Sequence, residues 1–134
     1  MNSENSRLLV LRFCRLLSER KLEEMFALFA ENGTWAGVGN PNTFQYGGTR
    51  SKEASIELIG AFLSGFTTFT FNVVSTTAEG NRVAVEATSA GTGPGAKTYA
   101  NEYLLLFECA NDKIQRIREF FDQLAVLDYA AQAE

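Results

Sequence analysis

The fold of this chain is decided by Tyr99-Ala100-Asn101-Glu102-Tyr103-Leu104-Leu105-Leu106-Phe107 and by the later run Lys113-Ile114-Gln115-Arg116-Ile117-Arg118-Glu119-Phe120-Phe121-Asp122. Both runs are long and rich in aromatic and aliphatic residues, and the short polar turn Ala110-Asn111-Asp112 separates them. Apolar runs of this kind on either side of a short polar turn predict a β-hairpin.

Successive side chains of a strand point to opposite faces of a sheet, so each run has one mainly apolar face. These faces carry Tyr99, Asn101, Tyr103, Leu105 and Phe107 in the first run, and Gln115, Ile117, Glu119 and Phe121 in the second. If they are the inner faces, Glu119, Asn101 and Tyr103 enter an apolar interior together, which predicts a pocket. A β-bulge would shift the register by one residue and exchange the two faces.

The length and composition indicate one globular domain, spanning residues 1–134. Eleven phenylalanines supply enough apolar surface to line a cavity as well as to fill a core. The net charge of −4 argues against a nucleic-acid partner, because phosphate binding needs a concentrated basic surface. The sequence has no run of about eighteen apolar residues, so we expect no membrane partner.

Other local features exclude several kinds of site. Residues 1–7 lack the basic and apolar segments of a secretory signal, so we expect a cytoplasmic protein. Cys14 and Cys109 have neither a disulfide framework nor metal-ligand spacing, which favours small core residues. Residues 91–95 are rich in glycine, but a strand rather than a helix follows them, so they do not predict a phosphate-binding loop. We expect no metal site and no cofactor.

Helical spacing of apolar residues predicts two helices near the N-terminus. The first covers residues 5–18, and the second begins near residue 22 and ends at Asn32-Gly33. Residues 35–48 are too rich in glycine and asparagine for a regular element, and they fit either a movable lid or an irregular connection. Ser51 then predicts the N-cap of a third helix.

From residue 66 onward the apolar period changes from helical to alternating. Residues 69–73 and 83–89 show this alternation, and residues 124–131 predict a short closing helix. The order indicates the α+β class, with three N-terminal helices packed on one face of a strongly curved, mainly antiparallel sheet. Helices that close the open side of such a sheet leave a cone-shaped hollow.

Four segments carry a resemblance to a known family. They are Leu22-x-x-Met25-Phe26-Ala27-Leu28-Phe29-Ala30-Glu31-Asn32-Gly33-Thr34-Trp35, Tyr46-Gly47-Gly48, Tyr99-x-Asn101-x-Tyr103 and Lys113-Ile114-x-x-Ile117-Arg118-Glu119-Phe120-Phe121-Asp122. In this order they resemble the SnoaL-like branch of the nuclear-transport-factor-2-like (NTF2-like) superfamily, which implies a cone-shaped NTF2-like roll. That superfamily holds ketosteroid isomerases, limonene-epoxide hydrolases, polyketide cyclases, dehydratases and proteins without known chemistry, so the resemblance is less specific for function.

The ketosteroid isomerase pattern is not matched at its catalytic positions. Ketosteroid isomerases use a base carboxylate, a tyrosine on the first helix and a protonated aspartate. The resemblance puts Gly37 at the base, Phe13 at the tyrosine and Tyr103 at the aspartate. The base and the main donor are missing, so this resemblance does not imply the isomerase mechanism here.

Two other enzyme patterns are matched in part or not at all. The resemblance to limonene-epoxide hydrolases puts Glu119 at their last aspartate, but it puts Ala87 and Ser89 at their charged pair. Polyketide cyclases of the SnoaL type commonly use an Asp and His pair, and this chain has no histidine. Any acid/base chemistry near neutral pH would need a carboxyl or phenol group with a perturbed pKa.

Glu119 is the candidate catalytic acid/base, and Tyr103 and Asn101 are its candidate catalytic partners. A carboxyl group against apolar walls is poorly solvated, which raises its pKa and suits it to proton transfer. In the alternative interpretation, tyrosine or asparagine donors simply satisfy Glu119, or Arg50 pairs with it. The side chains expected to contact a ligand are Phe13, Trp35, Tyr46, Phe71, Tyr99, Ile117 and Phe121.

Two functions are consistent with these residues. One is a cofactor-independent enzyme, an isomerase, dehydratase, cyclase or hydrolase, that acts on a small hydrophobic organic molecule through Glu119. The other is a non-catalytic ligand-binding or accessory module. The missing charged pair and histidine favour the module, whereas the cluster of Glu119, Asn101 and Tyr103 favours the enzyme.

The outer face of the predicted hairpin indicates a homodimer. Leu104, Leu106 and Phe120 share that face, and apolar side chains in a row on an antiparallel sheet normally need a cover. The charged residues expected to frame them are Arg116, Arg118, Glu86 and Glu102. We therefore expect a homodimer through the outer sheet face.

Overall fold

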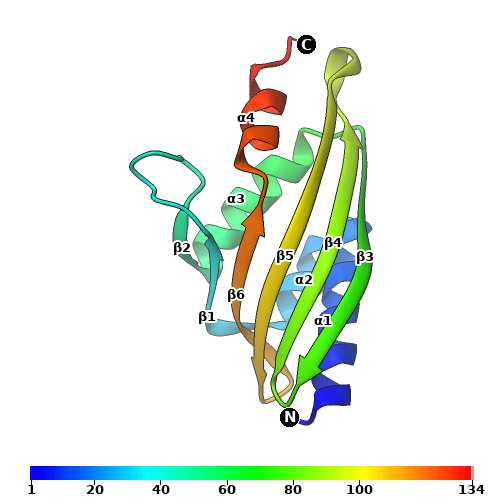
Figure 1. The fold of residues 1–134 in the computed structure, drawn as a ribbon, viewed down its shortest axis with the longest axis vertical. Helices are drawn as coiled ribbons and strands as arrows, with labels where there is room; N and C mark the ends of the chain where they lie inside the picture. The colour runs from blue at the N-terminus through cyan, green and yellow to red at the C-terminus, as the bar shows by residue number, and fades with distance from the viewer. Residues whose placement is uncertain (134) are drawn as a thin grey trace.

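One curved sheet of six strands forms the body of the protein, whose computed structural model describes residues 1–133 (Figure 1). The strands are β1 (Phe29–Gly37), β2 (Gly48–Ser51), β3 (Thr68–Glu79), β4 (Arg82–Thr92), β5 (Thr98–Ala110) and β6 (Lys113–Phe121). They lie in the order β2-β1-β6-β5-β4-β3. β1 runs parallel to β6, and the other neighbouring pairs are antiparallel.

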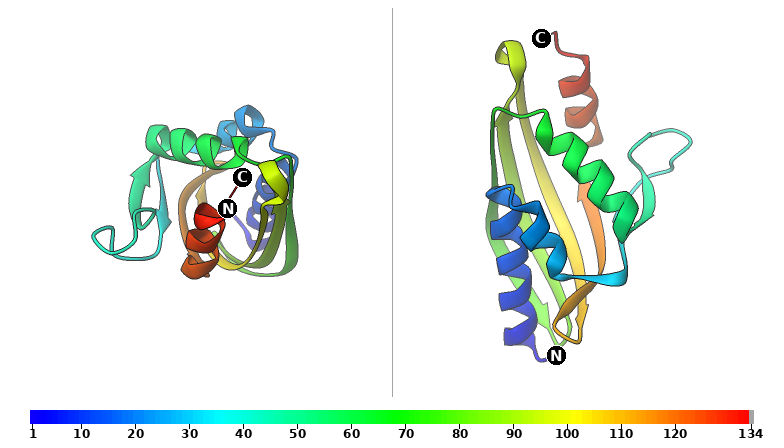
Figure 2. Two further views of the ribbon diagram at one scale, coloured as in Figure 1. Left: turned by 90° about the horizontal axis from the view of Figure 1, so that it is seen from above. Right: turned by 180° about the vertical axis from the view of Figure 1, so that it is seen from behind.

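Within the same residues, four α-helices accompany the sheet. They are α1 (Ser3–Ser18), α2 (Leu22–Ala27), α3 (Lys52–Ser64) and α4 (Gln123–Ala131), and a short 3₁₀ turn, Pro94–Ala96, connects β4 to β5. Helices α1, α2 and α3 cover one face of the curved sheet, and α4 lies near the start of β5 (Figure 2). The predicted α+β class, with helices packed on a curved and mainly antiparallel sheet, is confirmed.

The predicted second helix is too long. α2 ends at Ala27, and Phe29–Gly37 form β1 instead of a further helical turn. Asn32-Gly33 lies where the register between β1 and β6 is irregular, rather than at a helix end. A Cβ atom on Gly33 would lie 2.8 Å from the ring of Phe29, so this irregularity requires a residue without a side chain. The order of elements is therefore two helices, two strands and only then the third helix.

The β5–β6 hairpin forms as predicted, and its register decides which side chains face inward. Leu105 lies opposite Glu119, and both belong to the inner face. The register shifts only close to the turn, between Glu108 and Cys109, where Ile114 is buried in place of the expected Gln115. Because this bulge lies on the turn side of Glu119, it does not exchange the faces of the rest of the hairpin.

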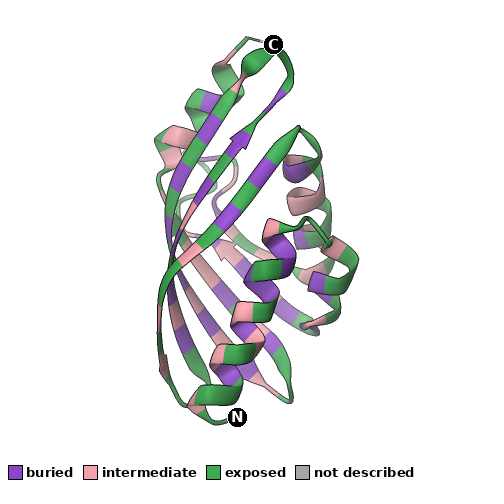
Figure 3. Ribbon diagram, turned by 90° about the vertical axis from the view of Figure 1, so that its right-hand side faces the viewer, coloured by how far each residue is buried: buried purple, intermediate pink, exposed green. Residues whose placement is uncertain are grey.

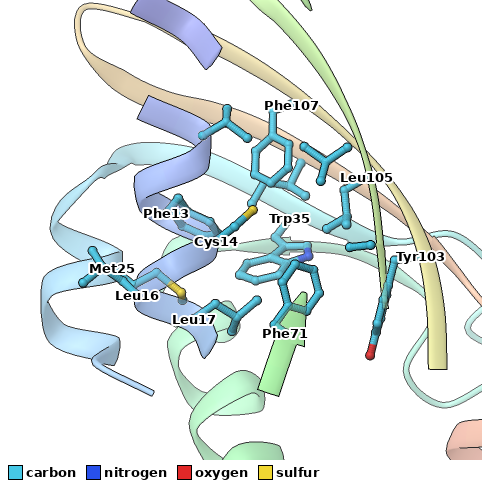
Figure 4. Packing of buried hydrophobic residues seen from close by; sticks show 14 of the residues in the cluster. Phe13, Cys14, Leu16, Leu17, Met25, Trp35, Phe71, Tyr103, Leu105 and Phe107 are labelled. Carbon is cyan, nitrogen blue, oxygen red and sulfur yellow. The ribbon is translucent and has the colours of Figure 1, made fainter. Parts of the chain in front are cut away.

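The core lies between α1 and the inner face of the sheet (Figure 4). The ring of Phe13 packs against Trp35 and Phe107, with centroids 5.7 and 5.8 Å apart. Buried and exposed residues alternate along the strands, whereas the helices turn one buried side to the sheet (Figure 3). Cys14 and Cys109 are free and buried, as the sequence predicts for small core residues, and burial raises the pKa of Cys14 to about 12.

One buried hydroxyl group of α1 generates a prediction about stability. Ser6 is fully buried, and its Oγ has no hydrogen-bond partner among residues 1–133. We predict that Ser6→Ala raises the free energy of unfolding by about 0.5–2 kcal/mol, because an unpaired buried hydroxyl group is costly. Urea unfolding measures the change.

Ser55 provides the matched control for this prediction. It is equally buried in a helix, but its Oγ donates a hydrogen bond to the carbonyl oxygen of Ser51 at 2.7 Å. Ser55→Ala should therefore lower the free energy of unfolding by about 1 kcal/mol. A Ser6→Ala variant that loses as much stability as Ser55→Ala would show that the Ser6 hydroxyl group is satisfied in solution.

Candidate functional site

A pocket opens between the inner face of the sheet, α3 and α4. Its walls are formed by Trp35, Gly37, Tyr46, Arg50, Ser55, Leu58, Ile59, Phe62, Tyr99, Tyr103, Glu119, Phe121 and Val126. Its empty space, counted together with its open mouth, is about 630 Å³. Most of the walls are aromatic or aliphatic, so the pocket suits an apolar molecule.

Glu119 contributes the carboxyl group of this pocket. Its Oε1 accepts a hydrogen bond from Nε1 of Trp35 at 2.9 Å. Trp35 reaches it because β1 is parallel to β6 and pairs Trp35 with Ile117, two residues before Glu119. The same register pairs Gly37 with Glu119. A Cβ atom on Gly37 would lie 2.6 Å from the carbonyl oxygen of Tyr46, so the close approach of the backbone requires glycine there.

The surroundings of Glu119 change its acidity. Burial raises the pKa of its carboxyl group to about 7, because the charged form loses its hydration. The hydrogen bond from Trp35 and the positive charge of Arg50 both lower this pKa, but they offset the effect of burial only in part. Among residues 1–133, no salt bridge joins Glu119 to Arg50, contrary to the pairing weighed from the sequence. The acid and the anion are therefore both populated at neutral pH.

Arg50 instead holds the loop between β1 and β2, which projects at the left of Figure 1. Its guanidinium group donates hydrogen bonds of 2.9 to 3.4 Å to the carbonyl oxygens of Gln45, Tyr46, Gly47 and Gly48. Phe44 of the same loop is buried, and its ring packs against Tyr46 and Phe121 with centroids 5.6 and 5.7 Å apart. The glycine-rich stretch is thus an anchored wall of the pocket in this structure.

Two tyrosines that line the pocket carry its second group of polar atoms. The OH of Tyr103 lies 2.7 Å from Oγ of Ser89 and 3.2 Å from the OH of Tyr99. Nδ2 of Asn101 donates to the OH of Tyr99 at 2.7 Å and to the carbonyl oxygen of Asp122 at 3.0 Å. Burial raises the pKa of both tyrosines above that of a free phenol, so they remain neutral hydrogen-bond donors at physiological pH.

The structure brings together most of the site residues that the sequence suggests. Those that line the pocket are Glu119, Tyr103, Trp35, Tyr46, Tyr99 and Phe121. Those that lie outside its lining, as buried neighbours, are Asn101, Phe13, Phe71 and Ile117. Phe13 and Ile117 belong to the packed core, and Phe71 packs against the ring of Tyr103 with centroids 5.2 Å apart. Alternation along a strand predicts the face of a residue, but not where the packed core ends and the hollow begins.

The helices supply walls that the sequence does not predict. α3 contributes Ser55, Leu58, Ile59 and Phe62, and α4 contributes Val126. The helical spacing of residues 54–62 predicts an apolar side for α3, but that side is equally consistent with a filled core. Part of this side lines the pocket instead of a filled core because of how α3 packs over the sheet, and the sequence does not reveal that packing.

The polar groups of the pocket wall are carboxyl, guanidinium, phenol, indole and hydroxyl groups. Among residues 1–133, no group of histidine, cysteine, aspartate and glutamate side chains is arranged to hold a metal ion. In the same part of the chain, no helix combines the length and the apolar character needed to cross a membrane.

Comparison with solved structures defines the class of protein. The chain is similar to an NTF2-like protein from Burkholderia xenovorans LB400, with a TM-score of 0.73 and 21% identity over 96% of this chain and 98% of that one. It is similar to an LEH-like epoxide hydrolase of M. tuberculosis, with a TM-score of 0.75 and 18% identity over 95% and 90% of the two chains. It is also similar to TerC co-crystallised with polyporic acid, with a TM-score of 0.80 and 17% identity over 96% and 99%. The fold is therefore that of the NTF2-like superfamily.

A narrower assignment comes from the sequence. The SnoaL-like domain family matches residues 10–117. The chain belongs to this family, as the order of its segments suggests. A comparison with curated proteins found no match. The structural similarities, at 17–21% identity, establish the fold, so the activity has to be argued from the pocket.

The raised pKa of Glu119 predicts how stability depends on pH. Its ordinary value is 4.5 and its value in the folded protein is about 7, so the folded state binds more protons between these pH values. The free energy of unfolding therefore falls as pH rises through this window. We predict that Glu119→Gln, which cannot ionise, is more stable than the wild type above pH 7 by on the order of 2–3 kcal/mol. The difference should vanish below pH 4.5, and urea unfolding across a pH series measures it.

Glu31 provides a control of opposite sign. The hydrogen bond from Lys52 and its positive charge lower the pKa of Glu31 below its ordinary value. Glu31→Gln should therefore remove stability that the wild type has at neutral pH and loses in acid. A Glu119→Gln variant that parallels the wild type at every pH would contradict the raised pKa.

Proposed function

We propose that the protein binds a small hydrophobic organic molecule in this pocket and acts on it as a cofactor-independent cytoplasmic enzyme, with Glu119 as the acid/base. The reaction is a proton-transfer reaction: an isomerisation, a dehydration, a cyclisation or a hydrolysis. The observation that carries this proposal is a carboxyl group with a pKa of about 7 in the wall of an aromatic pocket.

The hydrogen bond from Trp35 gives the two carboxyl oxygens different roles. Oε1 accepts the indole N–H, so the proton of the acid form belongs on Oε2. The indole is itself held in place, because its ring packs against Phe13 and Phe26. A carboxyl group that is fixed in orientation and titrates near pH 7 suits both the removal and the delivery of a proton at neutral pH.

The solved structures of similar proteins support an organic ligand. TerC was co-crystallised with polyporic acid, and the protein of M. tuberculosis is described as an epoxide hydrolase. Both are similar to this chain over most of its length. We extend to this protein only the inference that its pocket holds a small organic molecule.

A non-catalytic binding or accessory module is the second candidate function. Glu119 supplies the one carboxyl group in the pocket wall of the described chain. Ala87 and Ser89, which align with the charged pair of limonene-epoxide hydrolases, are both buried and cannot ionise. A catalytic role therefore depends on Glu119 alone, and a single substitution separates the two candidates.

We predict that Glu119→Gln lowers turnover by about a hundredfold or more while ligand affinity changes only a few-fold. Glutamine keeps the shape of the side chain and its acceptor for Trp35, but it cannot exchange a proton. A ligand is first identified by thermal-shift screening of hydrophobic ring compounds that carry a carbonyl, hydroxyl or epoxide group. Steady-state kinetics and calorimetry on the wild type and the variant then measure turnover and affinity.

The control is Glu23→Gln, because Glu23 is exposed on α2 and does not belong to the pocket lining. It should leave both turnover and affinity unchanged. The rate of the wild type should also titrate with a pKa near 7, and the residual rate of Glu119→Gln should not. Turnover that survives Glu119→Gln would place the chemistry elsewhere, and a ligand that binds without turnover would favour the binding module.

We also propose a homodimer formed through the outer face of the sheet. Leu104 and Phe120 lie opposite one another on β5 and β6, and they are 52% and 40% exposed. Leu106, on the same face, is half-buried. Glu86 lies beside Leu104 on β4, and Arg118 lies beside Leu106 on β6. An apolar strip between charges of opposite sign fits a second copy turned by a two-fold axis.

We predict that light scattering gives the mass of a dimer at micromolar concentration. Leu104→Arg should weaken the dimer at least tenfold, because it puts a charge in the apolar strip. Leu124→Arg is the matched control, since Leu124 is 75% exposed but belongs to α4. A monomeric wild type, or equal effects of the two variants, would count against this interface.

A further inference from the structure

A chain of four hydrogen-bonding side chains lies along one wall of the pocket. Ser89 contacts Tyr103 at 2.7 Å, Tyr103 contacts Tyr99 at 3.2 Å, and Tyr99 contacts Asn101 at 2.7 Å. Ser89 and Asn101 are buried outside the pocket lining, whereas both tyrosines belong to it. The direction in which each group donates decides what the pocket offers to a ligand.

The amide of Asn101 fixes the direction at one end of this chain. Its Oδ1 accepts from the backbone N–H groups of Glu102 at 2.7 Å and Asp122 at 3.0 Å. Those backbone groups can only donate, so the atom facing Tyr99 must be the donor Nδ2. The OH of Tyr99 therefore accepts this hydrogen bond, and its own proton has to be placed elsewhere.

The hydroxyl protons of this chain outnumber the contacts between its hydroxyl oxygens. Ser89, Tyr99 and Tyr103 carry three hydroxyl protons, and two contacts link their oxygens. Each contact uses one proton, whichever group donates. Within residues 1–133 these three hydroxyl groups have no other hydrogen-bond acceptor. One hydroxyl proton is therefore left without an acceptor in the protein.

The pocket lining decides where this surplus proton lies. Ser89 is buried and lies outside the lining, so an unpaired donor there would face packed protein and would be costly. Ser89 therefore donates to Tyr103. The proton of Tyr103 or that of Tyr99 is then unpaired, and both residues belong to the pocket wall. In either arrangement the unpaired O–H belongs to a tyrosine that lines the pocket.

We infer that Tyr99 and Tyr103 form a subsite for an oxygen atom that accepts a hydrogen bond and has no proton of its own, such as the carbonyl oxygen of an apolar ring ketone or quinone. The inference rests on the proposed function, because it takes the pocket to be a small-molecule site. The aromatic and aliphatic side chains that hold the ring portion are Trp35, Tyr46, Leu58, Ile59, Phe62 and Phe121.

The register of the hairpin relates this subsite to Glu119. Tyr103 lies opposite Phe121, so Glu119 is its diagonal neighbour on the inner face. Diagonal neighbours on adjacent strands have Cβ atoms about 7 Å apart, so a carbonyl group held by Tyr103 lies close to the carboxyl group of Glu119. The carbonyl group thus binds beside the carboxyl group without replacing its hydrogen bond from Trp35.

The test uses three compounds with one bicyclic skeleton: 1-indanone, indane and 1-aminoindane. Calorimetry or ligand-observed NMR should give an affinity for indanone at least tenfold above that for indane. In the Glu119→Gln variant, whose side chain carries no negative charge to attract a cation, the protonated amine offers only donors to the tyrosine hydroxyl group and should bind no better than indane. The infrared C=O band of ¹³C-labelled indanone should move to lower wavenumber on binding, because a hydrogen bond weakens the carbonyl bond.

Counting protons also predicts the behaviour of variants. Tyr99→Phe and Tyr103→Phe each leave one tyrosine with a free proton, so each should keep the preference for indanone within about threefold. The double variant Tyr99→Phe/Tyr103→Phe should lose both the preference and the shift of the C=O band. Unchanged binding of indane would show that the double variant keeps its pocket. If the double variant does not fold, the shift of the infrared C=O band in the wild-type complex still tests whether the subsite donates a hydrogen bond.

Equal affinities for indanone and indane, or an unshifted C=O band in the bound state, would overturn the subsite. Glu119→Gln separates this inference from the proposed function, because the variant should keep the preference for the carbonyl compound. If the protein prefers the carbonyl compound but turns over no carbonyl compound, the subsite is supported and the catalytic function is rejected. If it turns over a compound whose C=O band does not shift on binding, the catalytic function is supported and the subsite is rejected. Failure of all three compounds to bind at millimolar concentration would overturn the pocket and the subsite together.

Discussion

The parallel pairing of β1 with β6 is the constraint on which the pocket depends. It brings Trp35 to Glu119, which lies 84 residues further along the chain, and so supplies the hydrogen bond of the carboxyl group. It also sets Gly37 opposite Glu119, where the absence of a side chain lets the backbone at Tyr46 come close. The packing of α3 against β1 then adds a wall of the pocket.

The polar groups around the hollow divide into those that the fold uses and those that remain for a ligand. The guanidinium group of Arg50 is engaged by loop carbonyl oxygens, and the indole N–H of Trp35 is engaged by Glu119. The proton of Glu119 and one hydroxyl proton of the Tyr99–Tyr103 pair have no acceptor within residues 1–133. In an apolar pocket such unpaired donors bind a ligand most strongly, because few waters compete for them.

Elements with a strong local signal could be predicted. Alternation over residues 99–107 and 113–121 predicts both the hairpin and the inward face of Glu119, and the N-cap at Ser51 predicts the start of α3. β1 could not be predicted in the same way. Phe29 continues the apolar spacing of α2, and Asn32-Gly33 resembles a helix end although it lies at an irregularity of the sheet.

For the candidate site, the residue order determines that Glu119 and Tyr103 share a face, because side-chain direction along a strand is a local property of the backbone. The tertiary structure decides that Trp35 is the hydrogen-bond donor, that α3 and α4 complete the walls and that Asn101 serves the fold rather than the hollow. The upward direction of the pKa shift of Glu119 could be predicted from its apolar strand neighbours, whereas the tertiary structure decides its size, a pKa of about 7. These properties depend on which distant segments pack around Glu119 and exclude water from it. A local pattern of residues does not determine that packing.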